Sequence, residues 1–148
     1  MTLKERLRED LKNAMRERDA DRKAALRMVL ASVQLAEVES PEPLSDEDIV
    51  VLIRKEVKRR EEALEMIREA GREDMVAEEL AQLKILREYL PAMMTEEEIR
   101  GLAQSVIDDL GASSMRDMGR VMGAIMPQVK GRADGRTVSQ VVRELLSS

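Results

Sequence analysis

Apolar residues recur every three or four positions along most of the chain, which is the spacing of one face of an α-helix. No stretch alternates apolar and polar residues over the length that a half-buried strand needs. The pattern therefore predicts an all-α fold. Its seven predicted helices cover residues 2–18, 20–39, 45–71, 72–90, 95–110, 114–126 and 133–146.

Four of these helices begin with a hydroxyl residue that is followed three positions later by an acid. The hydroxyl can accept a hydrogen bond from an amide of the first turn, and the acid favours the positive end of the helix dipole. The pairs are Thr2 with Glu5, Ser45 with Asp48, Thr95 with Glu98, and Ser114 with Asp117. Gly111 and Pro127 are expected to end the helices that they follow, and Gly71 is expected to end or kink the helix before it.

The segment LPAMMT, which starts at Leu90, marks the expected domain boundary. We expect an N-terminal domain of about four helices over residues 1–92 and a small three-helix domain over residues 93–148. The segment 20–39 is apolar almost all round, with Lys23, Arg27 and Gln34 forming one narrow polar stripe. A helix of this kind is predicted to be the central and most buried one.

Composition excludes most catalytic designs. The 148 residues include no Cys and no His, which removes disulfides, thiolate nucleophiles, imidazole bases and nearly all zinc sites. Pairs of neighbouring acids, such as Asp108 and Asp109, point about 100° apart on a helix and are poorly placed to share a substrate or a metal ion. We therefore expect no catalytic residue, metal or organic cofactor.

The chain begins with charged residues and contains no apolar run of membrane-spanning length. We therefore expect a cytoplasmic protein without a membrane partner. Its net charge of −5 is unevenly distributed, with balances of +3 in residues 1–36, −11 in residues 37–114 and +3 in residues 115–148. Because binding follows the local field, the acidic total does not exclude a nucleic-acid surface near the C-terminal end.

Two basic segments are candidates for such a surface. RKEVKRR, residues 54–60, is followed by acids that would form helical pairs, Lys58 with Glu62 and Glu56 with Arg60, so we interpret it as a solvated helix face. KGRADGR, residues 130–136, lies where the last helix is expected to start. It gathers cations around two glycines and one acid: Lys130, Gly131, Arg132, Asp134, Gly135 and Arg136.

Amides at a helix N-terminus together with flanking cations can bind phosphate or carboxylate, so KGRADGR is a candidate anion site. Arg116 and Arg120, four residues apart on the preceding helix, could extend it. The alternative is a turn between helices, in which glycine supplies a positive φ, Asp134 caps the helix and the cations are solvated. The spacing alone leaves both interpretations open.

The helix before KGRADGR contains two glycines on one face, Gly119 and Gly123, and each costs about 1 kcal/mol relative to alanine. Close packing against a neighbouring helix is the expected compensation, and close approach by a ligand's backbone is the alternative. Four methionines recur on the same helix, and we expect them in the core rather than on a recognition surface. They are Met115, Met118, Met122 and Met126.

The run DMGRVMGAIMPQVKGRADGRTVSQVVRELL, from Asp117 to Leu146, resembles the C-terminal signature of the GatB/YqeY family. RMVLASVQ at 27–34, EAGRED at 69–74 and EYLPAMMTEEEI at 88–99 agree with the family pattern, so the resemblance covers essentially the whole chain. The chain departs from the pattern at Gln128, where Lys is usual, and at Ser139, where Asn is usual. The first departure removes one positive charge from the basic segment.

The resemblance implies a helical N-terminal region and a C-terminal domain similar to the tail of the B subunit of glutamine-dependent aspartyl/glutamyl-tRNA amidotransferase. In that enzyme the tail binds tRNA, while the reaction occurs elsewhere. At the family level the implied activity is that of a carbon-nitrogen ligase with glutamine as amido-N-donor. The residues of this chain offer no ATP site, ammonia channel or amidase nucleophile, so the resemblance supports a binding role more than a reaction.

We therefore expect a tRNA-binding protein that is accessory to tRNA-dependent amidation or aminoacylation, working with an aminoacyl-tRNA synthetase or an amidotransferase. With no Phe or Trp and a single Tyr, the chain lacks a stacking platform for single-stranded bases, so structured RNA rather than DNA is the expected ligand. The alternative is an adaptor that docks on a tRNA-charging enzyme without binding RNA itself.

Overall fold

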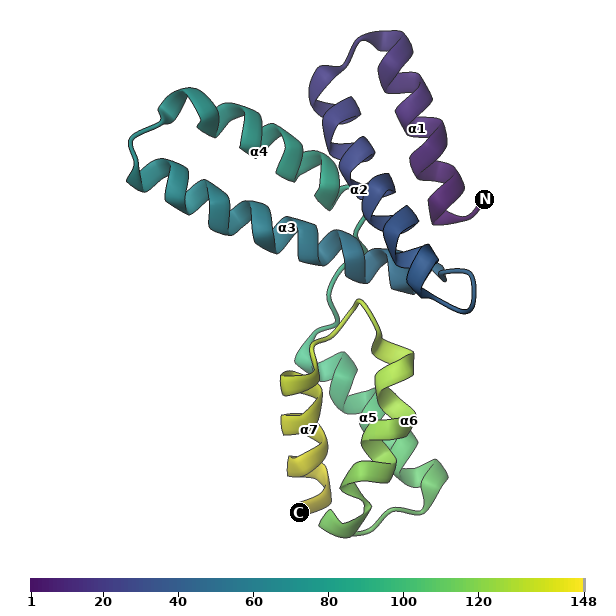
Figure 1. The fold of residues 1–148 in the computed structure, drawn as a ribbon. Coiled ribbons are helices and arrows are strands. Elements are labelled where there is room, and N and C mark those ends of the chain that lie inside the picture. The colour runs from purple at the N-terminus through teal and green to yellow at the C-terminus, as the bar shows by residue number, and fades with distance from the viewer. Residues whose placement is uncertain (148) are drawn as a thin grey trace. The chain divides into compact units, whose positions relative to one another are not determined.

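The computed structural model describes residues 1–147, and all regular structure in this range is helical, as predicted (Figure 1). None of these helices is long and apolar enough to cross a membrane. The elements are α1 (Leu3–Glu17), α2 (Ala20–Glu39), α3 (Asp46–Glu69), α4 (Glu73–Arg87), α5 (Glu96–Leu110), the 3₁₀ turn η1 (Met115–Asp117), α6 (Met118–Val129) and α7 (Gly135–Ser147).

All four predicted helix starts form reciprocal capping boxes. At the start of α5, for example, the Glu98 amide donates to the Thr95 hydroxyl at 3.1 Å and the Thr95 amide donates to the Glu98 carboxylate at 3.1 Å. Each box satisfies two of the amides that a helix N-terminus otherwise leaves without a partner. The box at Ser114 opens the turn η1, which leads directly into α6.

One predicted helix end is wrong, because α6 passes through Pro127 and ends at Val129. A proline forfeits one backbone hydrogen bond, but here only two helical residues follow it. Val129 is fully buried, so its packing offsets the lost bond.

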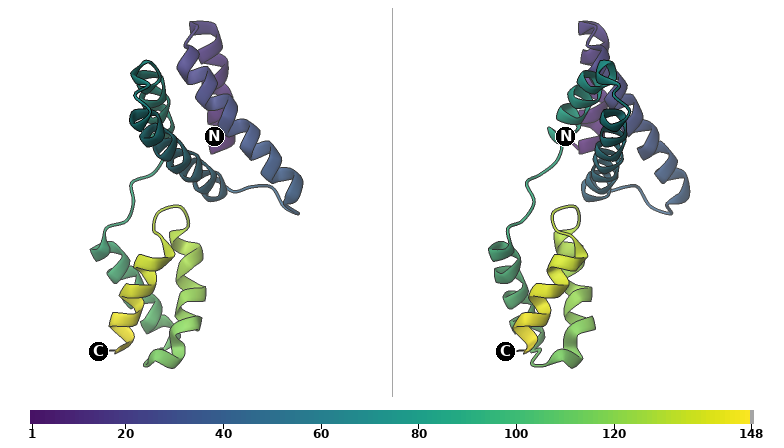
Figure 2. Two further views of the ribbon diagram at one scale, coloured as in Figure 1. Left: turned by 60° about the vertical axis from the view of Figure 1, so that its left-hand side comes forward. Right: turned by 90° about the vertical axis from the view of Figure 1, so that its left-hand side faces the viewer.

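The contacts divide the chain into two compact units, one ending at Leu90 and the other starting at Pro91. The predicted boundary at residues 92 and 93 stays a prediction, because packing does not show that either part folds independently. In the first unit α1 pairs with α2, α3 pairs with α4, and α2 also contacts α3 and α4. In the second unit α5, α6 and α7 contact one another in all three pairings (Figure 2).

Each unit has its own aliphatic core. Residues of the first core come from all four helices and those of the second from all three. Side chains with 2% exposure or less include Leu7, Leu26, Ile53 and Leu86 in the first unit and Ile99, Val121, Ile125, Val138 and Val142 in the second.

As predicted, α2 is central, because it contacts the three other helices of the first unit, but it is not the most buried helix, because more residues are buried on α3. Its inner face buries Ala25, Leu26, Val29 and Val33. Its outer face leaves Leu35 66% and Val38 78% exposed. The three neighbouring helices reach only one side of α2, and nothing else in the first unit covers the other side.

A buried polar cluster lies between α3 and α4. Arg60 donates to Glu56 on α3 at 3.1 Å and to Gln82 on α4, and all three side chains are buried. A further nitrogen of Arg60 lies 3.0 Å from the sulfur of Met28 on α2. The predicted pair of Glu56 and Arg60 therefore exists, but it is buried, so the interpretation of residues 54–60 as a solvated face holds for Lys55, Lys58 and Arg59 and is wrong for this pair.

The only tyrosine ties α1 to the end of the first unit. The Tyr89 hydroxyl donates to the Asp10 carboxylate, and the Arg6 guanidinium lies over the ring at 4.6 Å from its centre. Burial, together with the hydrogen bond to Asp10, raises the pKa of Tyr89 to about 12. Ionisation of Tyr89 would place two negative charges side by side in this contact.

Loss of the Arg60 side chain should be strongly destabilising. Arg60→Ala leaves the buried Glu56 with only the exposed Arg59 as a cationic partner and removes the donor to Gln82, so we expect the free energy of unfolding to fall by about 1 to 3 kcal/mol in urea denaturation. The matched control is Lys58→Ala on the exposed side of α3, which should change this free energy by less than about 0.5 kcal/mol. Equal effects of the two changes would contradict the role of the buried cluster.

The single tyrosine allows its titration to be followed directly by tyrosinate absorbance. We expect a midpoint near pH 12 in the folded protein and near pH 10 in urea. Because the folded state holds the proton more tightly, Tyr89 contributes stability that is complete below about pH 10 and is lost as pH rises through about 12. Tyr89→Phe should remove that part of the alkaline loss. A folded-state midpoint near 10 would contradict the contact with Asp10.

Candidate nucleic-acid interface

The predicted basic segment forms the loop between α6 and α7. Gly131 has φ of 79°, in the left-handed region that favours glycine. The amides of Arg132 and Ala133 both donate to the Val129 carbonyl, at 2.8 and 3.0 Å, and so close the C-terminal end of α6. Gly131 therefore has a structural reason to be glycine.

Asp134 caps α7. Its carboxylate accepts from the Thr137 amide at 2.8 Å and from the Thr137 hydroxyl at 3.1 Å. The bond from the Thr137 amide is the main reason that the pKa of Asp134 lies below its ordinary value. Because this carboxylate already occupies the N-terminus of α7, the geometry agrees with the turn interpretation for Asp134. Gly135 is the first residue of the helix.

Arg132 connects this loop to the segment that precedes α5. Its side chain donates to the Ala92 carbonyl at 3.3 Å, and its own carbonyl accepts from the Met94 amide at 2.8 Å. Its positive charge also contributes to the lowered pKa of Glu98, although the capping bond from the Thr95 amide is the larger cause. The side chains of Lys130 and Arg136 are exposed.

The structure does not bring Arg116 and Arg120 to this loop. They lie at the opposite end of α6, whose 12 residues span about 18 Å at 1.5 Å per residue. Arg120 donates to the Leu110 carbonyl at 3.0 Å and lies 3.4 Å from Asp117, so it also holds the turn after α5. Arg116 is exposed and forms no ion pair within residues 1–147.

The surface of α6 between these two groups of cations carries the glycines. Gly119, Gly123 and Pro127 follow one another at four-residue spacing on the exposed side of the helix, and we call them the α6 face. A β-carbon added at Gly119 or Gly123 would meet no atom within 4 Å. The predicted close packing against a neighbouring helix is therefore wrong at both positions.

The methionines of this helix lie mainly on its other side. Met118, Met122 and Met126 are half-buried and pack against the core of the second unit, as predicted. Only Met115, in the turn η1, is largely exposed, at 43%. The α6 face is therefore composed of small residues rather than methionines.

This arrangement combines positive charge with open space beside the α6 face. Cations lie at both ends of the α6 face, which consists of two glycines and one proline. Within residues 1–147 no group of three acidic side chains is placed to hold a metal ion. The cations could be identified from the sequence. The α6 face could not, because only the structure shows that Gly119 and Gly123 have no packing neighbour.

Relatives with similar sequences are fungal proteins named altered inheritance of mitochondria protein 41, mitochondrial. The protein from Pyrenophora tritici-repentis is 35% identical over 146 residues, covering 97% of this chain and 80% of the relative. That from Kluyveromyces lactis is 28% identical over 135 residues, covering 89% and 69%. These names contradict the predicted cytoplasmic location. That prediction used the absence of a signal peptide and a membrane span, and neither absence distinguishes one compartment from another.

The family comparison covers nearly the whole chain. The model of the family described as Yqey-like protein matches residues 4–146, which run from the first turn of α1 to the last turn of α7. The match includes the α6 face and the basic loop as well as the four helices of the first unit. Together with the Pyrenophora relative, this match shows that the chain belongs to the Yqey-like protein family.

Proposed function

We propose that the protein binds structured RNA, with tRNA as the expected ligand, through the α6 face and the loop of residues 130–136. The observation that carries the proposal is the open space beside Gly119 and Gly123. Each glycine costs α6 about 1 kcal/mol of helix propensity, and no contact within the described residues compensates for it. A ligand that must approach the helix backbone closely would supply the reason.

The cations at both ends of the α6 face suit the RNA backbone. Arg116 lies before the face, and Lys130 and Arg136 lie after it, so positive charge borders a length of about 18 Å. Several phosphates of one RNA strand fit within that length, because successive phosphates of a double helix lie only a few ångströms apart along its axis. Arginine and lysine are the side chains that most often contact phosphate oxygens.

The chain is better suited to reading shape than to reading bases. Its single aromatic residue, Tyr89, is buried in the first unit and bonded to Asp10, so it offers no surface for base stacking. Contacts to phosphates and small residues on a helix fit a double-stranded region of folded RNA. We infer contacts to the backbone with little dependence on sequence.

The biological role that we propose is accessory. The proposal rests on the resemblance of the C-terminal sequence to the tail of the amidotransferase B subunit, which implies that this chain would hold tRNA for amidation or aminoacylation by a separate enzyme, such as an aminoacyl-tRNA synthetase or an amidotransferase. An adaptor that docks through the methionines of α6 is less well supported, since three of the four pack against the core.

Replacing Arg116, Lys130 and Arg136 together by alanine should weaken binding of every tRNA tested. Phosphate contacts do not depend on sequence, so the loss should be similar for different tRNAs. The dependence of log affinity on log salt should become shallower by about 2 to 3 if all three residues contact phosphates. Arg132 is left intact because its side chain also bonds the Ala92 carbonyl. Fluorescence anisotropy over a series of salt concentrations measures both quantities.

The matched control for this triple change removes the same charge from exposed lysines of the first unit, Lys55, Lys58 and Lys84. We expect it to leave tRNA affinity nearly intact, because these side chains lie on α3 and α4. An equal loss of affinity in both variants would mean that only the total charge matters, and the proposed interface would be wrong.

The glycines of the α6 face should separate stability from binding. Because both positions are open, Gly119→Ala with Gly123→Ala should raise the free energy of unfolding by about 1 to 2 kcal/mol in total. Gly123→Leu, which adds bulk on the same surface, should leave the fold intact and weaken tRNA binding by roughly tenfold or more. Unchanged tRNA affinity in the leucine variant would contradict the role of this face.

A further inference from the structure

The outer face of α2 carries a continuous apolar stripe that the RNA-binding proposal does not use. Its five exposed residues follow one another at spacings of 4, 3, 4 and 3, and we call them the α2 stripe: Ala24, Met28, Ala31, Leu35 and Val38. This is the spacing of the a and d positions of a coiled coil. The 20 residues of α2 extend over about 30 Å, so the stripe is several helical turns long.

An exposed stripe of this kind is unusual in a helix of a water-soluble bundle, where the outer face is normally polar. Its last two members are largely exposed, Leu35 at 66% and Val38 at 78%. Large contiguous apolar surfaces on folded proteins mark sites of interaction. Apart from the contact of the Met28 sulfur with Arg60, the described residues leave the α2 stripe exposed and open to a partner.

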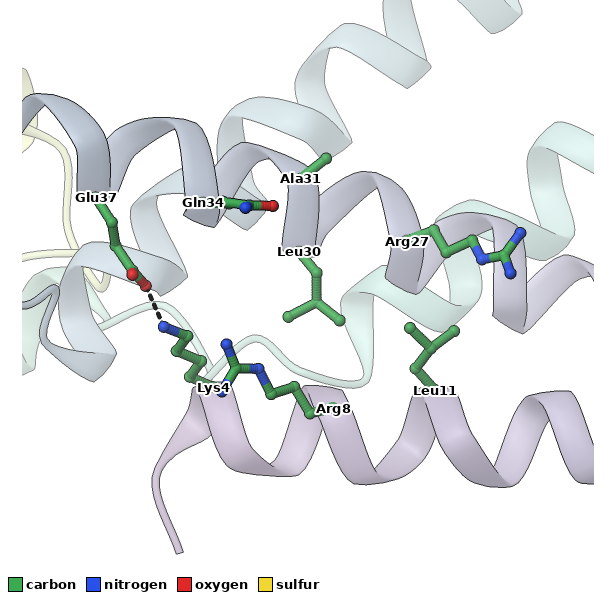
Figure 3. Close-up of a pocket in the computed structure, with 8 residues that line it drawn as sticks. All are labelled: Lys4, Arg8, Leu11, Arg27, Leu30, Ala31, Gln34 and Glu37. Atoms are coloured by element: carbon green, nitrogen blue, oxygen red, sulfur yellow. Dashed lines mark hydrogen bonds and ion pairs between the residues drawn. The ribbon is translucent and has the colours of Figure 1, made fainter.

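A hollow beside the stripe offers room for apolar side chains. It has a volume of about 410 Å³ and lies between α1 and α2 (Figure 3). Leu11 on α1 and Leu30 on α2 point into the space between the helices, and Ala31 belongs both to this lining and to the α2 stripe. Lys4 and Glu37, whose charged atoms are 2.5 Å apart, join the two helices at one end.

The rim of the hollow is basic. Arg8 reaches from α1 toward α2, and Arg27 extends outward from α2 next to the stripe (Figure 3). Both side chains are lining residues of the hollow, and neither forms an ion pair with any residue in the range 1–147. The one acid of the lining, Glu37, is already paired with Lys4. The rim therefore has positive charge available for a negatively charged partner.

We propose that the α2 stripe and the adjoining hollow bind an acidic amphipathic helix of another protein. Apolar side chains of that helix, at positions i, i+3, i+4 and i+7, would cover the stripe and enter the hollow. Its carboxylates would lie beside Arg8 and Arg27. Charge complementarity of this kind fixes the orientation of the partner and raises the rate of association.

Charge also argues against a second copy of this chain as the occupant. A two-fold dimer brings the same patch of both subunits together, and when the two α2 helices pair antiparallel, the rims with Arg8 and Arg27 lie along the same edge of the interface. Like charges would then gather along one edge of the interface and oppose its formation. An acidic helix meets the same rim with attraction.

This proposal is independent of the RNA interface, because the stripe lies in α2 of the first unit and the α6 face lies in the second. The probe is a synthetic 21-residue helical peptide with Leu at its a and d positions and Glu at the flanking positions. Its counterpart carries Lys at those flanking positions. Binding of each peptide to the full chain is measured by fluorescence anisotropy at low salt, with circular dichroism to check that each variant is folded.

We expect the Glu peptide to bind at least about tenfold more tightly than the Lys peptide. Leu35→Asp should reduce binding of the Glu peptide by about tenfold or more, since it places a charge in the apolar contact. The matched control is Met66→Asp on α3, where the side chain is 69% exposed and lies outside the stripe. This control should leave the affinity unchanged.

A charge exchange gives the sharpest test. Arg8→Glu with Arg27→Glu should reverse the preference, so that the Lys peptide binds more tightly than the Glu peptide. The proposal is overturned if the Glu peptide does not bind below about 1 mM, if Leu35→Asp and Met66→Asp have equal effects, or if the exchange leaves the preference unchanged. It is also overturned if sedimentation shows a dimer of this chain that Leu35→Asp dissociates, because the stripe would then be occupied by a second copy.

Discussion

The structure depends on one geometric constraint, which is that a helix packed against two or three short neighbours is covered on one side only. Neither unit has enough helices to surround any of its members, so every helix keeps an outer face. The aliphatic cores fix which side turns inward, through residues such as Leu26 and Val29 on α2 or Val121 and Ile125 on α6. The composition of each outer face is then not needed for packing and reflects solvent or a partner.

Two outer faces depart from the polar composition that water favours, and they depart in opposite ways. On α2 the outer face is too apolar, because leucine, valine and methionine side chains are exposed there. On α6 the outer face contains Gly119 and Gly123, which have no side chains. Both glycines lower the helix propensity, and neither gains a packing contact in return. Positions at which a sequence departs from local preference, and at which no internal contact compensates for it, tend to lie on functional surfaces. This reasoning underlies both proposals, and it uses burial and open space rather than charge alone.

Helix positions and starts could be predicted from the sequence because they depend on local chemistry. The capping pair of Thr95 and Glu98 involves residues three positions apart, and the structure contains it as predicted. What could not be predicted depends on contacts distant in the chain. Arg60 is buried because α4, which carries its acceptor Gln82, packs against α3. The outer face of α2 is exposed because no further helix covers it. The same limit applied to Gly119 and Gly123, whose periodicity is equally compatible with packing and with open space. For the basic loop, the spacing identified Asp134 as a possible helix cap. The hydrogen bond from the Thr137 amide then showed that Asp134 does cap α7.

Both proposed partners are negatively charged, so charge alone would not direct each one to its own surface. The α2 stripe would desolvate an RNA backbone against leucine and valine side chains, and this cost opposes the attraction of the phosphates to Arg8 and Arg27. The α6 face offers an acidic helix cations but no apolar surface to cover, so the association would lack its main driving force. The two ligands are therefore distinguished by the residues that lie beside the cations. On α2 these are exposed apolar side chains, and on α6 they are two glycines and a proline. Specificity of this kind arises from the penalty for the wrong ligand as much as from attraction to the right one.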